Sequence, residues 1–549
     1  MHAHRYDHVT ASRAPALVAP TAVALAAIGL IATAALLGTL FLNGGTFTYT
    51  LDDPYIHLAL SENIARGHYG INMGEASSPS SSILFPFLLA PAAGTDLHAY
   101  VPLLLNAVAT IGLVALLFAL ARRCGLDGAP RGARYGSALV VTAVVAFNGV
   151  GVAFTGMEHS LHIAVSVAVV LGLVHVFEAG RVPWWLVAAM IAGPLLRYEG
   201  LGISSGALLV LLALGHYRAA LGTALALAVT IGAFTAFLVG QGLPPVPSST
   251  LTKSTLLAAG NERHGAGALA AITKNVSSAL SRSPGRLLLG LAALIVARPI
   301  VVRSFNRRSP AVLLAGFALT LTAAHLVAGR YGWQSRYELY ALFALLAAAL
   351  YQWRDVLVRC IEKAPRGRLG LRDRHTWALA LLPIAILILG LPYLRTTVRA
   401  PLAANNIYEQ QYQMHRFATA FHRGPVAVND LGWVAYRNPS YVLDLAGLGS
   451  EAARRALMTG TSREAFDVLA RRHDVTLAMV YPFVDRVIPA EWMPLARLHL
   501  SRRSLVVAAP TVVFYATRAD AVPVLQARLD AFATTLPPGV RLERQASPD

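Results

Sequence analysis

The feature that most constrains this chain is a succession of long apolar runs separated by short, arginine-rich connections. A helix needs about 20 predominantly apolar residues to cross the roughly 30 Å of hydrocarbon in a bilayer. Charged residues make up only 13% of the sequence, about half their usual share in a soluble domain. The pattern therefore predicts a polytopic α-helical membrane protein. The runs that we expect to span are residues 19–42, 100–121, 135–154, 160–177, 219–240, 286–302, 310–328, 337–353 and 376–394.

A further apolar stretch, residues 183–215, is interrupted by the sequence Arg197-Tyr198-Glu199-Gly200. It could form one helix with buried charges or two short helices that meet at a polar turn. Counting two spans from a cytoplasmic N-terminus places the arginine-rich connections on the cytoplasmic side, as the positive-inside rule requires. We therefore predict about eleven spans in the plasma (inner) membrane and an extracytoplasmic C-terminal segment. The first run, 19–42, exceeds a signal-peptide core, so we expect it to remain as an anchor.

Two parts follow from this topology. Residues 1–394 form the transmembrane module, whose outward segments include the loop 43–99, and residues 395–549 form an extracytoplasmic domain. The run 82–94 is too short and too rich in proline to span, so we expect it to lie in the interface or re-enter. The tail alternates short β-type runs with helical patterns, which predicts a compact α/β domain. The β-type runs are Pro425–Val428, Thr476–Tyr481 and Leu505–Tyr515, and the helical patterns lie near 450–472 and 519–535.

The formal net charge of +18 raises the question of nucleic-acid binding. The basic residues scatter between apolar runs and form no stripe, which argues against such a partner. The cysteines, Cys124 and Cys360, have no spacing typical of a zinc site or a disulfide framework. The bilayer is therefore the partner that composition indicates.

Adjacent carboxylates, Asp52 and Asp53, follow the first span directly. Asp53 fits the N-cap of a helix whose first residue is Pro54. Asp52 is not needed for the cap, so its carboxylate could accept a proton from a hydroxyl group or hold a divalent cation such as Mg, Mn or Ca. Both residues are candidate catalytic groups and tentative metal ligands.

Other ionisable residues fall in the predicted outward connections. A short connection contains Glu158 and His159, which could be only a helix cap. With Arg197 and Glu199 in the neighbouring connection, they would surround one pocket with opposite charges. Glu75, beside a serine-rich turn, is a weaker candidate, because such a turn is usually only a solvated loop.

Basic residues in two outward segments are candidates for a phosphate. Lys253 follows a proline-rich loop and could meet a phosphate as a point charge. The connection 329–338 holds Arg330 and Arg336 among aromatic residues. Those aromatics could simply anchor the interface, or the arginines could bind a lipid phosphate or stack on a sugar.

The chain resembles the GT-C superfamily of polytopic glycosyltransferases, and within it the bacterial arabinofuranosyltransferases that use a polyprenyl-phosphate sugar. The resemblance begins with a first span, the Asp52-Asp53 pair and a helix that ends at Arg66-Gly67. It continues in four short motifs: Gly156-Met157-Glu158, Arg197-Tyr198-Glu199-Gly200, the segment from Pro245 to Lys253, and Val428-Asn429-Asp430 with Leu443-Asp444-Leu445-Ala446-Gly447-Leu448.

The resemblance implies a hexosyl- or pentosyltransferase that works with inversion at the outer membrane face. It implies a polyprenyl-phosphate sugar as donor, a cell-envelope glycan or lipid as acceptor, and Asp52 as general base or metal ligand. The sequence contains no P-loop or nucleotide-binding glycine loop, so a nucleotide-sugar donor is not indicated.

Two other classes of protein also place many helices around intramembrane charge. A transporter or lipid flippase would be expected to show paired internal repeats, which this sequence lacks. An envelope-assembly scaffold would use the α/β domain as its binding module. In that domain we interpret Asp430 and Asp444 as turn and strand-end residues, with contact to a polysaccharide acceptor as the alternative.

Overall fold

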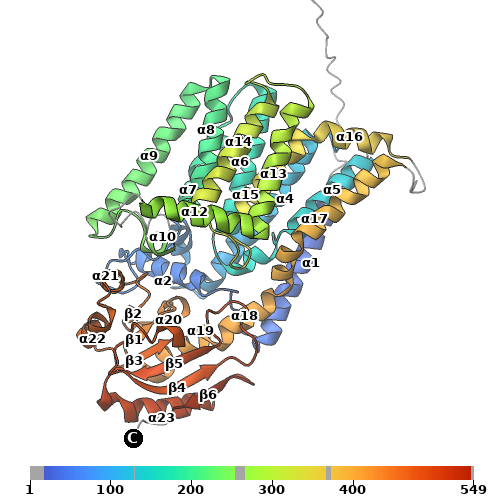
Figure 1. The fold of residues 1–549 in the computed structure, drawn as a ribbon. Helices are drawn as coiled ribbons and strands as arrows, with labels where there is room; N and C mark the ends of the chain where they lie inside the picture. The colour runs from blue at the N-terminus through green and yellow to red at the C-terminus, as the bar shows by residue number, and fades with distance from the viewer. Residues whose placement is uncertain (1–17, 129, 254–265, 366–372, 546–549) are drawn as a thin grey trace, which may run out of the picture.

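The computed structural model describes residues 18–128, 130–253, 266–365 and 373–545, to which all statements below refer. Figure 1 shows a bundle of long helices above a smaller domain built around a β-sheet. Residues 43–99, the predicted outward loop that follows the first helix, lie between these two parts. This segment is called the outer loop. This arrangement is the predicted one: a polytopic helical protein with a C-terminal α/β domain.

Eight helices of the described chain are long and apolar enough to cross a membrane. One of them, α5, is extended by η3 (Gly151–Thr155). A ninth candidate is the pair formed by α15 (Leu339–Gln352) and α16 (Arg354–Lys363), which is bent by 60°. The predicted runs all fall on these helices. The eight are α1 (Val18–Leu42), α4 (Val101–Arg123), α5 (Pro130–Ala146), α6 (His159–Ala179), α9 (Tyr217–Gly240), α13 (Ser283–Val301), α14 (Pro310–Ala328) and α17 (Arg374–Val398).

The stretch 183–215 forms two short apolar helices, α7 (Trp184–Leu196) and α8 (Gly200–Leu214). They meet at the polar turn that carries Arg197 and Glu199, so the two-helix alternative is the one observed. The turn depends on Gly200, because a Cβ there would lie 2.4 Å from the carbonyl carbon of Gly193. A larger residue would force the two helices apart.

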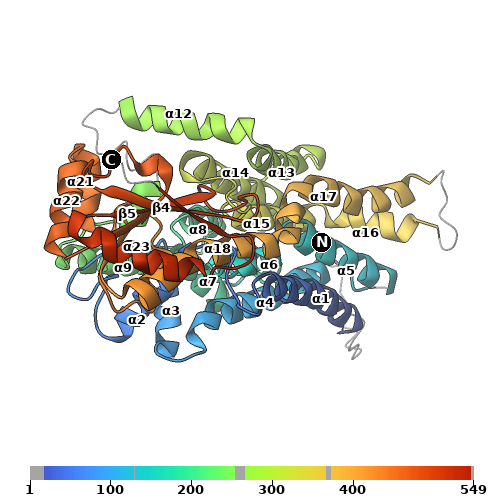
Figure 2. The same ribbon diagram turned by 90° about the horizontal axis from the view of Figure 1, so that it is seen from below.

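The helices form two groups. In the main group, α6 packs against α4, α7 and α15, and α14 packs against α8 and α13. In the second group, α5 packs against α1 and α17, and it leans away from the main bundle (Figure 1). Figure 2 shows α12 (Ala266–Ser281) along one edge of the bundle, beside α13 and α14.

The outer loop builds the short helices that lie under the bundle. Helix α2 (Asp53–Ala65) begins one residue earlier than predicted, so Asp52 occupies the N-cap position and Asp53 is the first helical residue. The Asp53 cap prediction is wrong, because neither carboxylate caps the helix and both have partners elsewhere. The run 82–94 forms only α3 (Phe85–Leu89) and η1 (Ala90–Ala92), which are too short to span. Further short elements on this side are η2 (His98–Tyr100) and α10 (Ser248–Lys253).

The C-terminal domain holds a six-stranded mixed sheet with strand order β2-β1-β3-β5-β4-β6. Strands β2, β1 and β3 are parallel, whereas β5, β4 and β6 join antiparallel. The predicted strands near 426 and 477 are present, but the predicted run Leu505–Tyr515 is a strand only from Thr511. The strands are β1 (Val426–Val428), β2 (Val442–Asp444), β3 (Leu477–Val480), β4 (Met493–His499), β5 (Thr511–Ala516) and β6 (Arg541–Arg544).

Helices cover the sheet and connect it to the membrane bundle. The predicted helical stretches are present as α21, α22 and α23. Buried side chains on both faces of the sheet, among them Phe514 and Phe466, form its core. The helical elements of this part are α18 (Ala400–Glu409), α19 (Gln411–Arg416), η4 (Phe417–His422), α20 (Gly432–Ala435), α21 (Glu451–Thr459), α22 (Ser462–Arg472), η5 (Pro482–Val484), η6 (Ala519–Ala521) and α23 (Val522–Ala533).

The outer loop and the sheet domain are joined by polar and aromatic contacts. The ring of Tyr55 on α2 stacks on Trp433 on α20, with their centroids 3.9 Å apart. Asn72 donates to the carbonyl of Val442 and accepts from its N–H, so it extends the edge of β2. The first outer helix is therefore held by the domain at the far end of the chain.

Candidate active site

The carboxylate of Asp52 lies at the junction between the outer loop and the sheet domain. Its Oδ2 accepts a hydrogen bond from the N–H of Gly432 at 2.6 Å, and its Oδ1 accepts one from Trp433 at 2.8 Å. The residue is only 6% exposed. A Cβ at position 432 would lie 2.1 Å from the Asp52 carbonyl oxygen, so only glycine allows this approach. The position of the Asp52 carboxylate therefore depends on glycine at position 432 and on the docking of the sheet domain against the outer loop.

A second carboxylate, Asp430, lies close enough to Asp52 for the two groups to interact electrostatically. Tyr481 and Gln411 each donate to its Oδ2 at 2.8 Å. Burial, then the neighbouring negative charge of Asp430, raise the pKa of Asp52 well above the usual value of an aspartic acid. Burial likewise raises the pKa of Asp430. Because a carboxylate with a raised pKa is a stronger base, Asp52 can accept a proton from a hydroxyl group.

Asp53 has a different partner: it pairs with Arg336, whose Nη2 lies 2.6 Å from Asp53 Oδ2. Arg336 is 2% exposed, and within the described residues its Nε and Nη1 have no hydrogen-bond partner. A buried guanidinium with unpaired donors is costly unless an anion completes its shell. The geometry therefore offers donors to a phosphate or carboxylate ligand.

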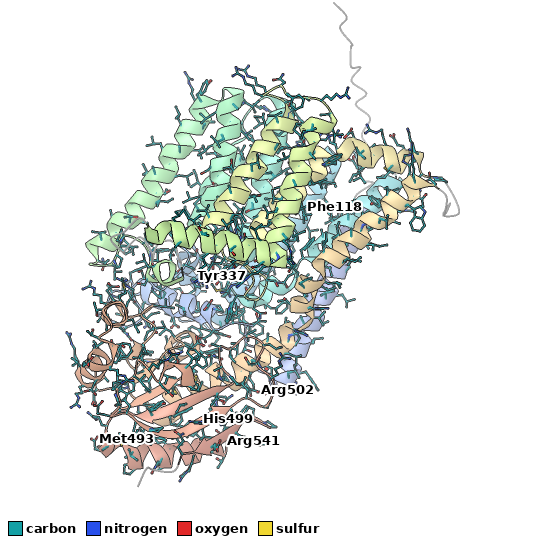
Figure 3. The ribbon with its side chains drawn as sticks, viewed as in Figure 1. Phe118, Tyr337, Met493, His499, Arg502 and Arg541 are labelled. Atoms are coloured by element: carbon teal, nitrogen blue, oxygen red, sulfur yellow. The ribbon has the colours of Figure 1, made fainter. Side chains whose placement is uncertain are left out.

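The ring of Tyr337 lies among three guanidinium groups. The guanidinium carbons of Arg336, Arg197 and Arg330 lie 4.9, 5.4 and 5.7 Å from the ring centroid. His159 packs edge-on against the same ring, and both of its ring nitrogens are buried without a hydrogen-bond partner. Figure 3 places Tyr337 where the helix bundle meets the outer loop. The predicted candidates Arg197, Arg330, Arg336 and His159 thus form one cluster around Tyr337.

Two carboxylates balance the buried Arg197 of this cluster. Its Nη1 lies 2.6 Å from Glu158 Oε1 and its Nη2 lies 2.8 Å from Glu199 Oε1. The second oxygen of Glu158 is 3.7 Å from His57 Nε2, and His57 is itself hydrogen-bonded to Ser80. The predicted grouping of Glu158, Arg197 and Glu199 is therefore present. Because its charge is compensated, Arg197 offers less to an anion than Arg336 does.

The loop that carries Arg336 has an unusual backbone. Trp333, Gln334 and Ser335 have φ values of 43°, 63° and 47°, a left-handed conformation that costs energy in residues with a side chain. The Asn148 amide donates to the carbonyl of Gln334, and Ser335 is hydrogen-bonded to Thr396. The surrounding helices therefore hold a strained turn that delivers Arg336 to Asp53.

Two of the predicted candidates lie elsewhere. Glu75 accepts hydrogen bonds from Tyr441 and Ser450, so in this structure it joins the outer loop to the sheet domain. Lys253 ends α10, and its side chain lies outside the described residues.

Sequence reasoning missed Gln411, Tyr481 and Asn148 as neighbours of the site. It named Asp430, two residues after a predicted strand, as a turn residue or an acceptor contact but not as a neighbour of Asp52. Asp444 does end β2 as predicted, and it accepts the N–H groups of Ala446, Leu448 and Gly449. Burial raises its pKa to about 6.

A divalent cation at Asp52 and Asp53 would need free carboxylate oxygens. Asp52 receives a backbone N–H on each oxygen, and Asp53 faces the positive charge of Arg336. The described residues contain no group of three or more His, Cys, Asp or Glu side chains arranged to hold a metal. A cation shared by Asp52 and Asp53 would compete with Arg336 for Asp53, so metal binding by this pair stays a prediction.

Comparison with known proteins gives one family and one recurrent fold. Residues 405–515 match a family described as "Domain of unknown function (DUF8728)". No curated protein matches the sequence. The Archaeoglobus fulgidus oligosaccharyltransferase in complex with Zn and sulfate matches with a TM-score of 0.50 and 13% identity, over 95% of this chain and 75% of that chain. The AglB oligosaccharyltransferase of the same organism, with an inhibitory peptide and a dolichol-phosphate, matches with a TM-score of 0.49 and 12% identity, over 96% and 76%.

The first of these structural matches defines the fold. This chain has a GT-C-like architecture, in which a polytopic helical bundle carries a C-terminal mixed-sheet domain. The predicted fold class is confirmed, and the apolar helices make the chain a multi-pass membrane protein.

Proposed function

We propose that this protein is an inverting membrane glycosyltransferase. It moves a hexosyl or pentosyl group from a polyprenyl-phosphate donor to a cell-envelope glycan or lipid acceptor. The reaction takes place on the outer face of the plasma membrane, with the N-terminus cytoplasmic and the sheet domain extracytoplasmic. The arabinofuranosyl-type resemblance makes a pentose the first donor to test.

The observation that carries this proposal is that Asp52 and Asp53 have different partners. One carboxylate is held beside Asp430 and has the environment of a base. The next residue is paired with a buried arginine that retains unpaired donors. The base, Asp52, is thus adjacent in sequence to the carboxylate that holds the anion-binding Arg336, at the membrane-facing end of the sheet domain, where a lipid-linked substrate would present its phosphate.

The donor phosphate is expected beside Arg336, Arg330 and His159. Arg336 supplies the unpaired N–H groups, and the positive charge around Tyr337 offsets the charge that develops on the leaving phosphate. Lys253 would add a further point charge. The sulfate-bound form of the oligosaccharyltransferase is consistent with a tetrahedral anion in such a fold.

The chemical step is a single displacement. The acceptor hydroxyl oxygen forms a bond to the anomeric carbon, and the bond from that carbon to the phosphate oxygen breaks. The polyprenyl phosphate leaves with the electron pair, and the hydroxyl proton passes to the Asp52 carboxylate. One displacement inverts the anomeric configuration.

Dependence on a divalent cation remains a prediction, and no step of this mechanism uses one. The test is transfer of radiolabelled sugar from several pentosyl and hexosyl polyprenyl-phosphate donors by the purified protein, with and without chelator. Asp52→Asn is expected to abolish transfer, whereas the matched control Asp520→Asn, at an exposed site on η6, keeps it. No transfer from any donor would contradict the proposal and favour the transporter, flippase or scaffold alternatives.

A further inference from the structure

A basic pocket lies away from Asp52, where α17 meets the sheet domain. Its volume is about 240 Å³, which is large enough for a phosphate group. Its wall is formed by residues from α17, from α18, from the left-handed turn 333–335 and from the loop before β5. The lining residues are Gln334, Pro392, Arg395, Thr396, Arg399, Ala403 and Leu505.

The positive charge of this pocket is uncompensated. Arg395, in the last turn of α17, and Arg399, the residue that caps its C-terminus, are exposed and four positions apart, and neither forms an ion pair with any residue that the structure describes. Like charges at this spacing repel each other on a helix. They also lie at the end of the bundle opposite the arginine-rich connections, where the positive-inside rule disfavours arginine. An anion in the pocket would remove both penalties.

The face of α17 that leads to the pocket is apolar and open. Ile384, Ile388 and Leu391 are 47%, 60% and 43% exposed. Because helix residues three and four positions apart share a face, the stripe from Ile388 through Leu391 continues into Arg395 and Arg399. An acyl chain lying on this stripe would place its headgroup between the two arginines.

We infer that this pocket binds the headgroup phosphate of an anionic phospholipid whose acyl chains lie along α17. The site is separate from the donor phosphate site proposed at Arg336, and it would exist whether or not the protein is a glycosyltransferase. Its wall includes Gln334, and the neighbouring Ser335 is hydrogen-bonded to Thr396. A bound lipid would therefore also brace the turn that precedes Arg336.

The test is native mass spectrometry of the full-length protein in detergent, titrated with phosphatidylglycerol, phosphatidylcholine or inorganic phosphate. Wild type is expected to retain phosphatidylglycerol selectively. The double variant Arg395→Gln/Arg399→Gln is expected to bind it about tenfold more weakly, because each arginine beside an anionic lipid contributes separately. Arg541→Gln, on the exposed strand β6 far from the bundle (Figure 3), is the matched control and is expected to bind as wild type does.

Equal retention of phosphatidylglycerol by wild type and double variant would overturn the inference. Equal retention of phosphatidylglycerol and phosphatidylcholine by wild type would also overturn it. So would binding of inorganic phosphate to saturation without displacement of bound phosphatidylglycerol. If the double variant does not fold, Arg399→Gln alone is expected to weaken the binding of phosphatidylglycerol, but by less than the double variant would. Binding is measured without turnover, so failure of the proposed transferase activity leaves this test unaffected.

Discussion

The Oδ2 atom of Asp52 accepts a 2.6 Å hydrogen bond from the N–H of Gly432, although the two residues are 380 positions apart in the chain. The neighbouring N–H of Trp433 binds the other oxygen. The carboxylate that follows the first membrane helix is thus oriented by the last domain of the protein. Correct docking of the sheet domain is therefore a condition for a working site.

Replacing Asp52 with asparagine is expected to lower the turnover number by at least about 10²-fold, the usual contribution of a general base. The amide keeps one acceptor oxygen, so one of the two backbone bonds is lost and the free energy of unfolding falls by about 1 kcal/mol. Radiolabel transfer and thermal unfolding in detergent measure the two effects. Full activity in a folded Asp52→Asn protein would remove this residue as the base.

Replacing Asp430 with asparagine is expected to shift the acidic limb of the pH–rate profile to lower pH. The negative charge of Asp430 raises the pKa of Asp52, and the base acts only when it is deprotonated. Removing that charge lowers the pKa of Asp52, so the active form persists in more acidic solution. The measurement is the pH dependence of transfer for wild type, Asp430→Asn and the control Asp520→Asn. An unchanged limb in Asp430→Asn would contradict the coupling.

Replacing Arg336 with glutamine is expected to raise the KM for the donor at least about tenfold, through loss of a charge-assisted contact to phosphate. Arg336→Lys restores the charge but not the planar fork, so only partial recovery is expected. The KM for the acceptor should change little. Equal changes in both constants would indicate a general structural defect instead.

The pair formed by Glu158 and Arg197 is buried, so breaking it should cost stability. Glu158→Gln is expected to lower the free energy of unfolding by about 3 kcal/mol, the lower end for loss of one partner of a buried ion pair. The lower end applies because Arg197 keeps Glu199. A double-mutant cycle with Arg197→Gln, measured by unfolding in detergent, gives the coupling energy. Additive effects would show that the pair contributes no coupling.

Asn72 completes two backbone hydrogen bonds at Val442, so it tests the docking of the outer loop on the sheet domain. Asn72→Ala is expected to destabilise this contact by about 1–3 kcal/mol, because it leaves buried backbone groups unpaired. Limited proteolysis in the segment 66–84 should become faster, while the helical bundle stays resistant. A protease pattern identical to wild type would show that the contact is dispensable.

Much of the architecture followed from short-range patterns. The length of each apolar run predicts a spanning helix, because every backbone group in a bilayer must be paired within the chain. The break between α7 and α8 at Arg197 was predicted from loop charge, because only two spans there place the arginine-rich connections on the cytoplasmic side. Strands β2, β4 and β6 were missed, because a strand in a mixed sheet is stabilised by its neighbours more than by its own residues.

The candidate site divides in the same way. Asp52, Asp53, Glu158, Arg197 and Arg336 were recognisable in the sequence, because ionisable residues beside membrane helices are costly and therefore stand out. Asn148 was not, because an asparagine at a helix end is common in any fold, and Asp430 was named only as a turn residue or an acceptor contact, because an aspartate after a strand is equally common.

The sequence by itself determined that this chain crosses a membrane, where it does so, and which charged residues lie near the ends of the helices. Only the tertiary structure decided that Asp52 faces Asp430 while Asp53 faces Arg336. Adjacent residues point in different directions, and the direction of each depends on partners hundreds of positions away. Local periodicity carries no information about such contacts, because they form only when the bundle and the sheet domain pack together.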